Sequence, residues 1–498
     1  MRSKNLSNLS FVLVLFISFF YNTSFIKPHN LSGDAVSNFQ SSIYISSNSK
    51  NLNNSEKLQI SSRSVIVPYF NSLFISAYFK KNKIDECYKN INSKDLGKTF
   101  EERSSRLSNE CKDIHTALQY FFLALFYILI ILTIWIGKLF KLDKNYLLLL
   151  FIVLNFNTFN LSKILSDSTE ILAAIFMNIS IISIYYYFKN YLYSVFFGLS
   201  LGLLFLSKKI FIFSPIFILL LAVYYLLKKI SIKKVFLNTF LAMLSFIIIF
   251  STSNLIFKDY KSKEGRLFEK GNHVLVIRAA YLLNINLKNY FIAGIAFTPI
   301  YGDKLLKKFK NYKIVQPFLN DPNKNGRDRN SIMIYANPIV LDYYMRENNI
   351  KNINLNNYNS FFSDGVINYP TIINVYKKNI FKNIICTPLF LYRSLFPGIG
   401  KDVLNYNYNG FSEKIYKFLL NLYKILNPIL ILTLLIFFLF SLRNIRQNDY
   451  LILLSLPIFS LFLHSFITHG LGRYSAIVIP FSVVIVIFCI KSILSKDE

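Results

Sequence analysis

The chain lacks the Gly-rich loops by which many nucleotide-using enzymes hold phosphates. Neither a P-loop nor a dinucleotide fingerprint occurs in its 498 residues, so we expect no soluble nucleotide donor. Cysteine and histidine are scarce, with four and five residues, and no Cys/His spacing indicates a zinc site. These absences exclude well-marked classes of enzyme and leave any chemistry to residues outside the standard soluble-enzyme motifs.

Acidic residues are also few. The 26 Asp and Glu residues are outnumbered by 56 Lys and Arg residues, which gives a formal net charge of +30. Such an excess can indicate nucleic-acid binding, but these lysines are spread along the chain and flank apolar runs. That distribution follows the positive-inside rule of membrane proteins. We therefore expect membrane lipids around the chain and no nucleic-acid partner.

Long apolar runs are abundant. Hydrophobic residues make up 53% of the sequence, and 50 residues are Phe. Because a helix needs roughly 20 apolar residues to cross a bilayer, the sequence predicts an all-α polytopic membrane protein with about ten transmembrane helices. The first run has no small-residue cleavage site after it, so we expect a retained anchor and not a signal peptide. The runs fall near residues 9–26, 115–136, 146–163, 169–187, 192–207, 210–227, 235–257, 425–442, 449–467 and 475–491.

The charges of the connecting loops predict an orientation. The short loops on one side of the predicted bundle are all basic, which places them in the cytoplasm. Two large loops then lie outside, and their semi-apolar pieces are expected to form interfacial helices. The Ser- and Asn-rich stretch 37–55 is expected to be a flexible loop. The chain thus divides into an anchor helix (1–26), a first non-cytoplasmic loop (27–114), a helix bundle (115–257), a large non-cytoplasmic loop region (258–424) and C-terminal transmembrane helices (425–498).

Two of the four cysteines, Cys87 and Cys111, lie in the first of these outer loops. Oxidation is open to them outside the cytoplasm. The sequence leaves two alternatives, a disulfide or two free thiols. Cys386 and Cys489 have apolar sequence neighbours and are expected to be inert packing residues.

Two aspartates lie beside apolar segments on the predicted outer side. Asp34 comes shortly after the first segment, and Asp167 stands just before the segment 169–187. A carboxylate at the lipid–water boundary can act as a general base, accepting a proton from an attacking hydroxyl. The alternative for both residues is structural, because Asp is a common N-cap of helices.

Cations gather on the same predicted side. A short turn between the last two apolar segments carries Arg473 and Tyr474, preceded by His469, which fits a plain polar turn residue better than a catalyst. A guanidinium can hold a phosphate in a bidentate pair, although Arg and Tyr also anchor helices at membrane boundaries. Lys208 and Lys209 form a basic pair that could face lipid phosphate or snorkel from a helix end. Further outside cations that could complete a phosphate site are Arg63, Arg278 and Arg393.

The order of these motifs resembles that of the multi-spanning GT-C glycosyltransferases, which use polyprenyl-phosphate sugars. Protein O-mannosyltransferases and the bacterial aminoarabinose transferase of lipid A belong to that group. Its first outer loop opens with one or two acids, as at Gly33-Asp34, and a later helix starts with an Asp, as at Asp167. The single acid at Asp34 departs from the common Asp-Glu pair.

Two further motifs carry the resemblance. A Gly-rich helix leads to a basic motif in that family, as in the segment 198–209, although Lys208-Lys209 stands where Arg-Pro is frequent. The last helix often begins Arg-Tyr with a Pro shortly after, as do Arg473-Tyr474 and Pro480. The resemblance spans most of residues 1–260 and 450–490, while the region 258–424 resembles nothing we can name.

The resemblance implies an inverting transfer from a polyprenyl-phosphate-linked sugar donor to a lipid, glycan or protein acceptor. It implies no metal and no cofactor, and it implies an active site on the periplasmic side of a bacterial inner membrane. Asp34 would take the proton of the acceptor, and Asp167 would orient the site or help to bind the acceptor. Arg473, with Tyr474 and Lys208 or Lys209, would hold the leaving phosphate by fixed positive charge.

Other classes of membrane protein stay open. An O-antigen ligase or polymerase would rely on Arg and His in the large outer loop, which contains His273, Arg278, Arg327 and Arg329. A flippase for a lipid-linked glycan would carry charges inside its helices, and most of the apolar segments here lack them. A non-catalytic scaffold is the third alternative. Asp34 favours the glycosyltransferase interpretation.

Overall fold

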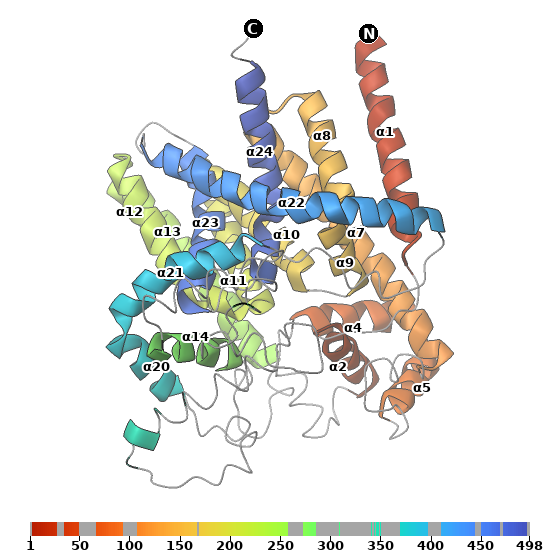
Figure 1. The fold of residues 1–498 in the computed structure, drawn as a ribbon, viewed down its shortest axis with the longest axis horizontal. Helices are drawn as coiled ribbons and strands as arrows, with labels where there is room; N and C mark the ends of the chain where they lie inside the picture. The colour runs from red at the N-terminus through yellow and green to blue at the C-terminus, as the bar shows by residue number, and fades with distance from the viewer. Residues whose placement is uncertain are drawn as a thin grey trace. The chain divides into compact units, whose positions relative to one another are not determined.

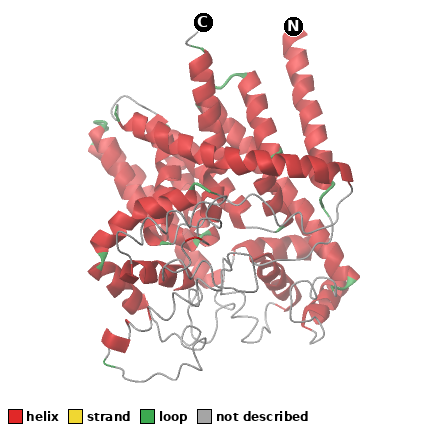
Figure 2. Cartoon of the chain, in the orientation of Figure 1, coloured by secondary structure: helices red, strands yellow, loops and turns green. Residues whose placement is uncertain are grey.

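A computed structural model describes residues 2–26, 34–48, 66–92, 107–166, 169–256, 272–284, 369–396, 410–443, 450–468 and 472–495, with single positions between 308 and 349. Over these residues the regular secondary structure is helical, without a strand, as Figure 2 shows. The described part of the chain is therefore all-α, as the sequence predicts. It forms two compact units. The large unit comprises Met1–Gly265, Gly398–Phe459 and Ala476–Glu498, and the small unit comprises Arg266–Pro397 and Ser460–Ser475.

Several helices have the length and apolarity of membrane spans, which makes this an integral membrane protein. Six qualify among the described residues, and a bent pair of helices makes a seventh if it is one span. The six lie in α7 (Asn109–Leu139), η2 (Lys209–Phe213) with α12 (Ser214–Leu227), α13 (Ile232–Ile256), α22 (Gly410–Leu442), α23 (Tyr450–Ile467), and the end of η7 (Gly472–Val478) with α24 (Ile479–Leu494).

The bent pair replaces the single helix that the sequence predicts over residues 146–163. It consists of α8 (Lys144–Asn155) and α9 (Thr158–Leu165), which meet at 52°. Asn157 explains the break, because its side-chain oxygen accepts a hydrogen bond from the Phe159 N–H at 3.0 Å and so starts a new helix. Its amide nitrogen donates to Asn427 of α22 at 3.0 Å. Figure 1 shows α22 running across α24, with which it packs.

Two central helices of the large unit are shorter than a typical span. They are α10 (Thr169–Tyr185) and α11 (Tyr191–Ser207), with 17 residues each. Nearly every residue of α10 is buried, as expected for a helix that is hydrophobic all round. Buried hydrogen bonds fix its neighbours: Asn178 donates to Thr133 of α7 at 2.8 Å, and the Ser180 and Ser200 hydroxyls lie 2.7 Å apart. This helix therefore forms the core of the large unit.

The Gly-rich part of α11 is a packing surface. A Cβ atom at Gly198 would overlap the Ala242 carbonyl oxygen of α13, and one at Gly202 would lie 2.7 Å from the Ile249 Cβ. Small residues four apart let two membrane helices approach closely. The segment 198–202 also has the G-x-S-x-G spacing of a hydrolase elbow, but that motif needs a strand-to-helix turn. Ser200 instead lies inside a helix.

Other helices of the large unit present apolar side chains to their surroundings. Exposed residues follow one another along α1 (Arg2–Thr23), along α12 from Ile216 to Leu227, and along α13 from Ile232 to Ile256. Apolar faces of this extent indicate contact with lipid. The expected anchor over residues 9–26 is thus a helix that ends at Thr23.

Helices also occupy part of the first polar region. They are α2 (Asp34–Asn48), α4 (Ile66–Tyr78) and α5 (Lys81–Asn92), and α2 packs against both of the others. The prediction of a flexible loop over residues 37–55 is wrong for residues 37–48, because Asn38, Ser41 and Ser42 are buried in α2. Residues 49–55 lie outside the described part. A disulfide joins Cys87 of α5 to Cys111 of α7, which confirms the first of the two alternatives for these cysteines.

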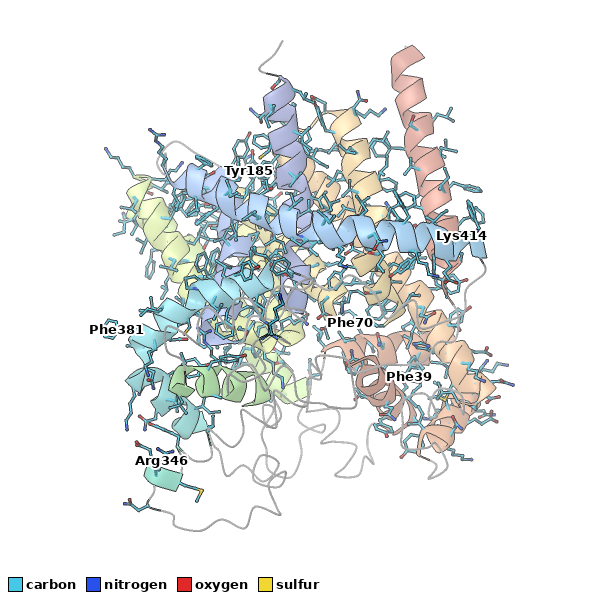
Figure 3. All side chains as sticks on the ribbon, in the orientation of Figure 1. Phe39, Phe70, Tyr185, Arg346, Phe381 and Lys414 are labelled. Atoms are coloured by element: carbon cyan, nitrogen blue, oxygen red, sulfur yellow. A yellow bond between two sulfur atoms is a disulfide. The ribbon has the colours of Figure 1, made fainter. Side chains whose placement is uncertain are left out.

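The small unit contains α14 (Asn272–Asn284), α20 (Tyr369–Lys378) and α21 (Ile380–Ser394), which pack against one another, together with the end of α23. One face of α21 is buried, while Phe381, Ile384 and Ile385 on its other side are exposed. Figure 3 labels Phe381, which points away from its helix. Outward apolar residues suit a helix that lies in a membrane interface. The unit also includes residues 460–475, which the sequence predicts to belong to the C-terminal transmembrane helices.

Candidate functional site

Lys208 forms a buried ion pair inside the large unit. It is the C-cap residue of α11, and its ammonium lies 2.7 Å from Oε1 of Glu170 in the first turn of α10. The side chains are 15% and 9% exposed, so water screens this pair little. An ammonium carries three N–H donors, and the contact with Glu170 uses one of them.

The ion pair brings one end of α11 to the start of α10. Lys209, next in the chain, opens η2 and is half-buried. Asp167 lies outside the described residues, between Ser166 at the end of α9 and Thr169 at the start of α10. In the described part of this segment, the acid that meets Lys208 is Glu170, three residues further along the chain than Asp167.

Asp34 is the first residue of α2. An acid in the first turn of a helix interacts favourably with the helix dipole, and the N-cap and catalytic roles considered for Asp34 both stay predictions. The side chain itself is outside what the structure describes, as is all of Arg63.

Arg278 is the most unusual cation of the described residues. It lies on α14 with 0% exposure and is the largest of the fully buried side chains. Its Nε and Nη2 both donate to Oδ1 of Asn383 on α21, at 2.9 and 2.7 Å, and Nη2 also donates to the Asn383 carbonyl oxygen at 3.1 Å. The guanidinium carbon stacks 4.0 Å from the centre of the Phe390 ring. A neutral amide and an aromatic face thus hold the charge.

No carboxylate of the described residues pairs with Arg278. Its Nη1 and the Asn383 Nδ2 are buried without a hydrogen-bond partner among those residues. Burial lowers the pKa of Arg278 to about 10, so the guanidinium stays charged at neutral pH. A buried charge without a counter-ion costs on the order of several kcal/mol. An anion placed against Nη1 of Arg278 and Nδ2 of Asn383 would offset that cost, and it would accept a hydrogen bond from each of these two nitrogens.

The surroundings of Arg278 reach the segment that leads to Arg473. Tyr376 lies on α20, which packs against α14 and α21, and its hydroxyl donates to the carbonyl oxygen of Ile467 at 2.5 Å. Burial raises the pKa of Tyr376, so the hydroxyl stays protonated and can donate. The hydroxyls of Ser394 and Ser465 lie 3.4 Å apart and join α21 to α23 as well. Ile467 ends α23, six residues before Arg473.

The predicted site residues fall into two groups. Arg278, Arg473 and Tyr474 belong to the small unit. Arg473 and Tyr474 follow Gly472, the first residue of η7, and their side chains are outside the described part. His469, in the same segment, is outside it altogether. The second group, in the ranges of the large unit, comprises Asp34, Asp167, Lys208 and Lys209. The structure thus brings Arg278 into the unit of the Arg-Tyr motif and brings Lys208 to the start of α10.

Sequence reasoning missed the partners of both cations. Glu170 is an acid in the first turn of an otherwise apolar helix, and that isolation was a signal of a buried pair. For Asn383 and Phe390 no comparable signal exists, because they lie over 100 residues from Arg278 and only the fold joins them. Burial of Cys386 raises the pKa of its thiol, as the expected inert packing role requires.

Neither a search for metal-binding groups nor comparison with known proteins assigns a further functional residue. The described residues contain no group of three His, Cys, Asp or Glu side chains that could hold a metal ion. No protein-family model, curated protein or solved structure matches the chain. The proposals below therefore rest on the residues themselves and on the resemblance carried by their motifs.

Proposed function

We propose that the protein is an inverting glycosyltransferase of the GT-C type, moving a sugar from a polyprenyl-phosphate donor to a lipid, glycan or protein acceptor. Arg278 carries the proposal, as a fully buried guanidinium with no acidic partner among the described residues. It belongs to the same unit as Arg473. A charge in this setting favours an anionic ligand, and a lipid phosphate delivers such an anion at a membrane boundary.

The proposed reaction has one bond formed and one broken. The acceptor oxygen or nitrogen bonds to the anomeric carbon, and its proton passes to Asp34 as general base. The bond between that carbon and the phosphate oxygen breaks, and its electron pair leaves with the lipid phosphate. Arg278 and Arg473 stabilise the leaving phosphate by fixed positive charge. Asp167 and the Lys208–Glu170 pair position the start of α10 in this scheme.

The site is proposed to lie outside the cytoplasm, on the periplasmic face of a bacterial inner membrane. The disulfide Cys87–Cys111 supports this, since such bonds persist in oxidising compartments. With about ten spans, both large loops face that side. Single cysteines at Ser49 and Asn357, in a background without the native cysteines, should react with an impermeant reagent in intact cells. Protection of both positions would reverse the orientation.

A substitution of Arg278 tests the proposed phosphate contact. Arg278→Met keeps an unbranched side chain and removes the charge. Binding of a polyprenyl-phosphate sugar and transfer from it should each fall about 100- to 1,000-fold, as for loss of a preorganised charge. The thermal midpoint of the purified protein should stay close to the wild-type value, because removing a buried ion without a counter-ion offsets the loss of its three hydrogen bonds to Asn383.

Arg346→Met is the matched control, because Arg346 is an exposed arginine of the small unit. Its effect on donor binding should be under about threefold, as for other exposed charges. Arg278→Lys keeps the charge but loses the planar fork, and its binding should fall between the wild type and Arg278→Met. A large drop in the thermal midpoint with unchanged donor affinity would make Arg278 a structural residue and remove it from the site.

The O-antigen ligase or polymerase remains the second candidate. Arg278 favours it too, since that class relies on arginines of the large outer loop. The two candidates differ in their need for Asp34, which only the GT-C scheme uses as the base.

A further inference from the structure

The large unit contains a cavity of about 920 Å³ where several of its helices begin or end. The lining includes Leu139 at the end of α7, Tyr185 at the end of α10 and Tyr450 at the start of α23. Tyr185 is labelled in Figure 3. The volume lies within the roughly 300–1,000 Å³ of small-molecule sites. No residue proposed above for sugar transfer lines this cavity.

Three lysines line the cavity, each from a different turn between helices. Lys141 follows α7, Lys189 follows α10, and Lys228 follows α12. The three turns, residues 138–144, 186–190 and 228–234, contain a single carboxylate, Asp143, and Lys491 of α24 pairs with it at 2.8 Å. The lysines of these turns are Lys138, Lys141, Lys144, Lys189, Lys228, Lys229, Lys233 and Lys234. Such a basic helix end belongs on the cytoplasmic side.

Aromatic rings form much of the remaining wall. The Lys189 ammonium lies over the rings of Tyr185 and Tyr186, at 5.5 and 4.7 Å from their centres, and Lys228 lies 5.8 Å from the centre of Tyr224. Phe188 and Phe488 add apolar surface. A small hydrated anion would gain little from these rings. A molecule with a negative head and an apolar body can use both the lysines and the rings.

We propose that this cavity binds the head group of an anionic phospholipid from the cytoplasmic leaflet. The phosphate lies among Lys141, Lys189 and Lys228, and the start of the acyl chains lies against the aromatic wall. Anionic lipids give that leaflet its negative surface potential, and basic pockets between membrane helices on this side take their head groups. The site is independent of the sugar transfer proposed above.

Lipid binding to the purified full-length protein tests the site. The probes are phosphatidylglycerol, phosphatidylcholine and glycerol 3-phosphate, with affinities measured by native mass spectrometry. Wild-type protein should bind phosphatidylglycerol well above phosphatidylcholine, and glycerol 3-phosphate should compete only weakly. The triple variant Lys141→Gln, Lys189→Gln, Lys228→Gln should bind phosphatidylglycerol roughly 100-fold more weakly, given the worth of each lysine near such a surface.

The triple variant Lys138→Gln, Lys144→Gln, Lys233→Gln is the charge-matched control, because it removes three lysines outside the cavity lining from two of these three turns. Its affinity should change less than about threefold, because none of these three lysines lines the cavity in which the phosphate is proposed to bind. Equal losses in the two triple variants would show diffuse surface attraction and overturn the site. Equal binding of phosphatidylcholine, or full competition by glycerol 3-phosphate, would overturn the lipid assignment.

Photocrosslinking to the wild-type protein tests the proposed lipid site even if the triple cavity variant fails to fold. Phosphatidylglycerol with a photoactivatable group near its glycerol should label the wild-type segment Tyr185–Lys189. The single variant Lys189→Gln should reduce that labelling several-fold. Labelling confined to other segments would reject the site without reference to the triple variant.

Discussion

The two units handle a buried cation in opposite ways. In the large unit Lys208 meets the carboxylate of Glu170 at 2.7 Å. In the small unit Arg278 meets a neutral amide and an aromatic ring, with Nη1 unsatisfied among the described residues. Both charges lie in low-dielectric surroundings, where an unbalanced ion costs far more than at a surface. Lys208 already has its counter-ion within the protein. Arg278 has none among the described residues, so a bound anion would stabilise it.

This difference separates two kinds of contribution to the proposed transfer. In the proposed transfer, the cation of the small unit would bind an anionic ligand, and the acids of the large unit would take part in proton transfer and positioning. Variants in the two units should therefore change different observables. Donor binding should follow the small unit, and turnover of bound donor should follow Asp34.

The largest expected effect comes from Asp34→Asn. Transfer should fall about 100- to 10,000-fold, the usual loss when a positioned base is removed. Donor affinity should stay within about threefold of wild type, because the amide keeps the size and polarity of the side chain. The measurement is single-turnover transfer from a polyprenyl-phosphate sugar beside direct donor binding.

Asp113→Asn is the control for that measurement. Asp113 is also an acid of the first predicted outer loop, with 62% side-chain exposure and an ion pair to Lys83. Its substitution should leave transfer within about twofold, because an exposed pair contributes little. Normal transfer by Asp34→Asn would favour the ligase or flippase class over the GT-C class.

A smaller effect on transfer than that of Asp34→Asn, accompanied by a clear loss of stability, is expected from Glu170→Gln. Removing one partner of a buried ion pair costs about 3–5 kcal/mol, since the other charge is left uncompensated. The thermal midpoint should drop clearly, and Lys208→Met added to Glu170→Gln should restore much of it. Arg278→Met, by contrast, should produce no drop.

The matched control is Glu413→Gln on α22. Glu413 pairs with Lys417 one helical turn later, and the Lys417 side chain is 58% exposed. This pair should be worth under about 0.5 kcal/mol. Equal midpoints for Glu170→Gln and Glu413→Gln would mean that burial does not distinguish the two pairs, and the contrast between the units would lose its basis.

The sequence predicts the positions of the helices well, and it predicts their breaks and packing partners poorly. Each predicted apolar segment overlaps a helix, because length and apolarity are local signals. The break at Asn157 escapes such reasoning, since part of what holds it is Asn427, 270 residues away. The burial of α10 escapes it too, because an apolar helix looks the same facing lipid or core. Ten spans stay a prediction beyond the six or seven candidate spans among the described residues.

The sequence likewise predicts some features of the candidate site residues and not others. Residue type and position in the chain single out Arg278 as one cation among several. Its importance comes from burial and from Asn383, which no sequence pattern reveals. The neighbouring lysines Lys208 and Lys209 are evident in the sequence. The ion pair of Lys208 with Glu170 depends on the packing of α10 against α11. The sequence therefore shows which residues carry a charge. Whether a buried charge has a partner of opposite charge is known only from the fold.

The smallest expected effect concerns the disulfide of the large unit. Cys87 and Cys111 are 24 residues apart, and closing such a loop stabilises the folded protein by about 3 kcal/mol in the chain-entropy model. The double variant Cys87→Ser, Cys111→Ser should have a lower thermal midpoint than wild type, and reductant should lower only the wild-type value. Cys386→Ser, at a buried thiol of the small unit, is the control and should keep the reductant sensitivity. Because the bond joins α5 to α7 within the large unit, donor affinity governed by Arg278 should survive its loss. A joint loss of stability and donor binding would mean that the two units unfold together, and the division of roles between them would fail.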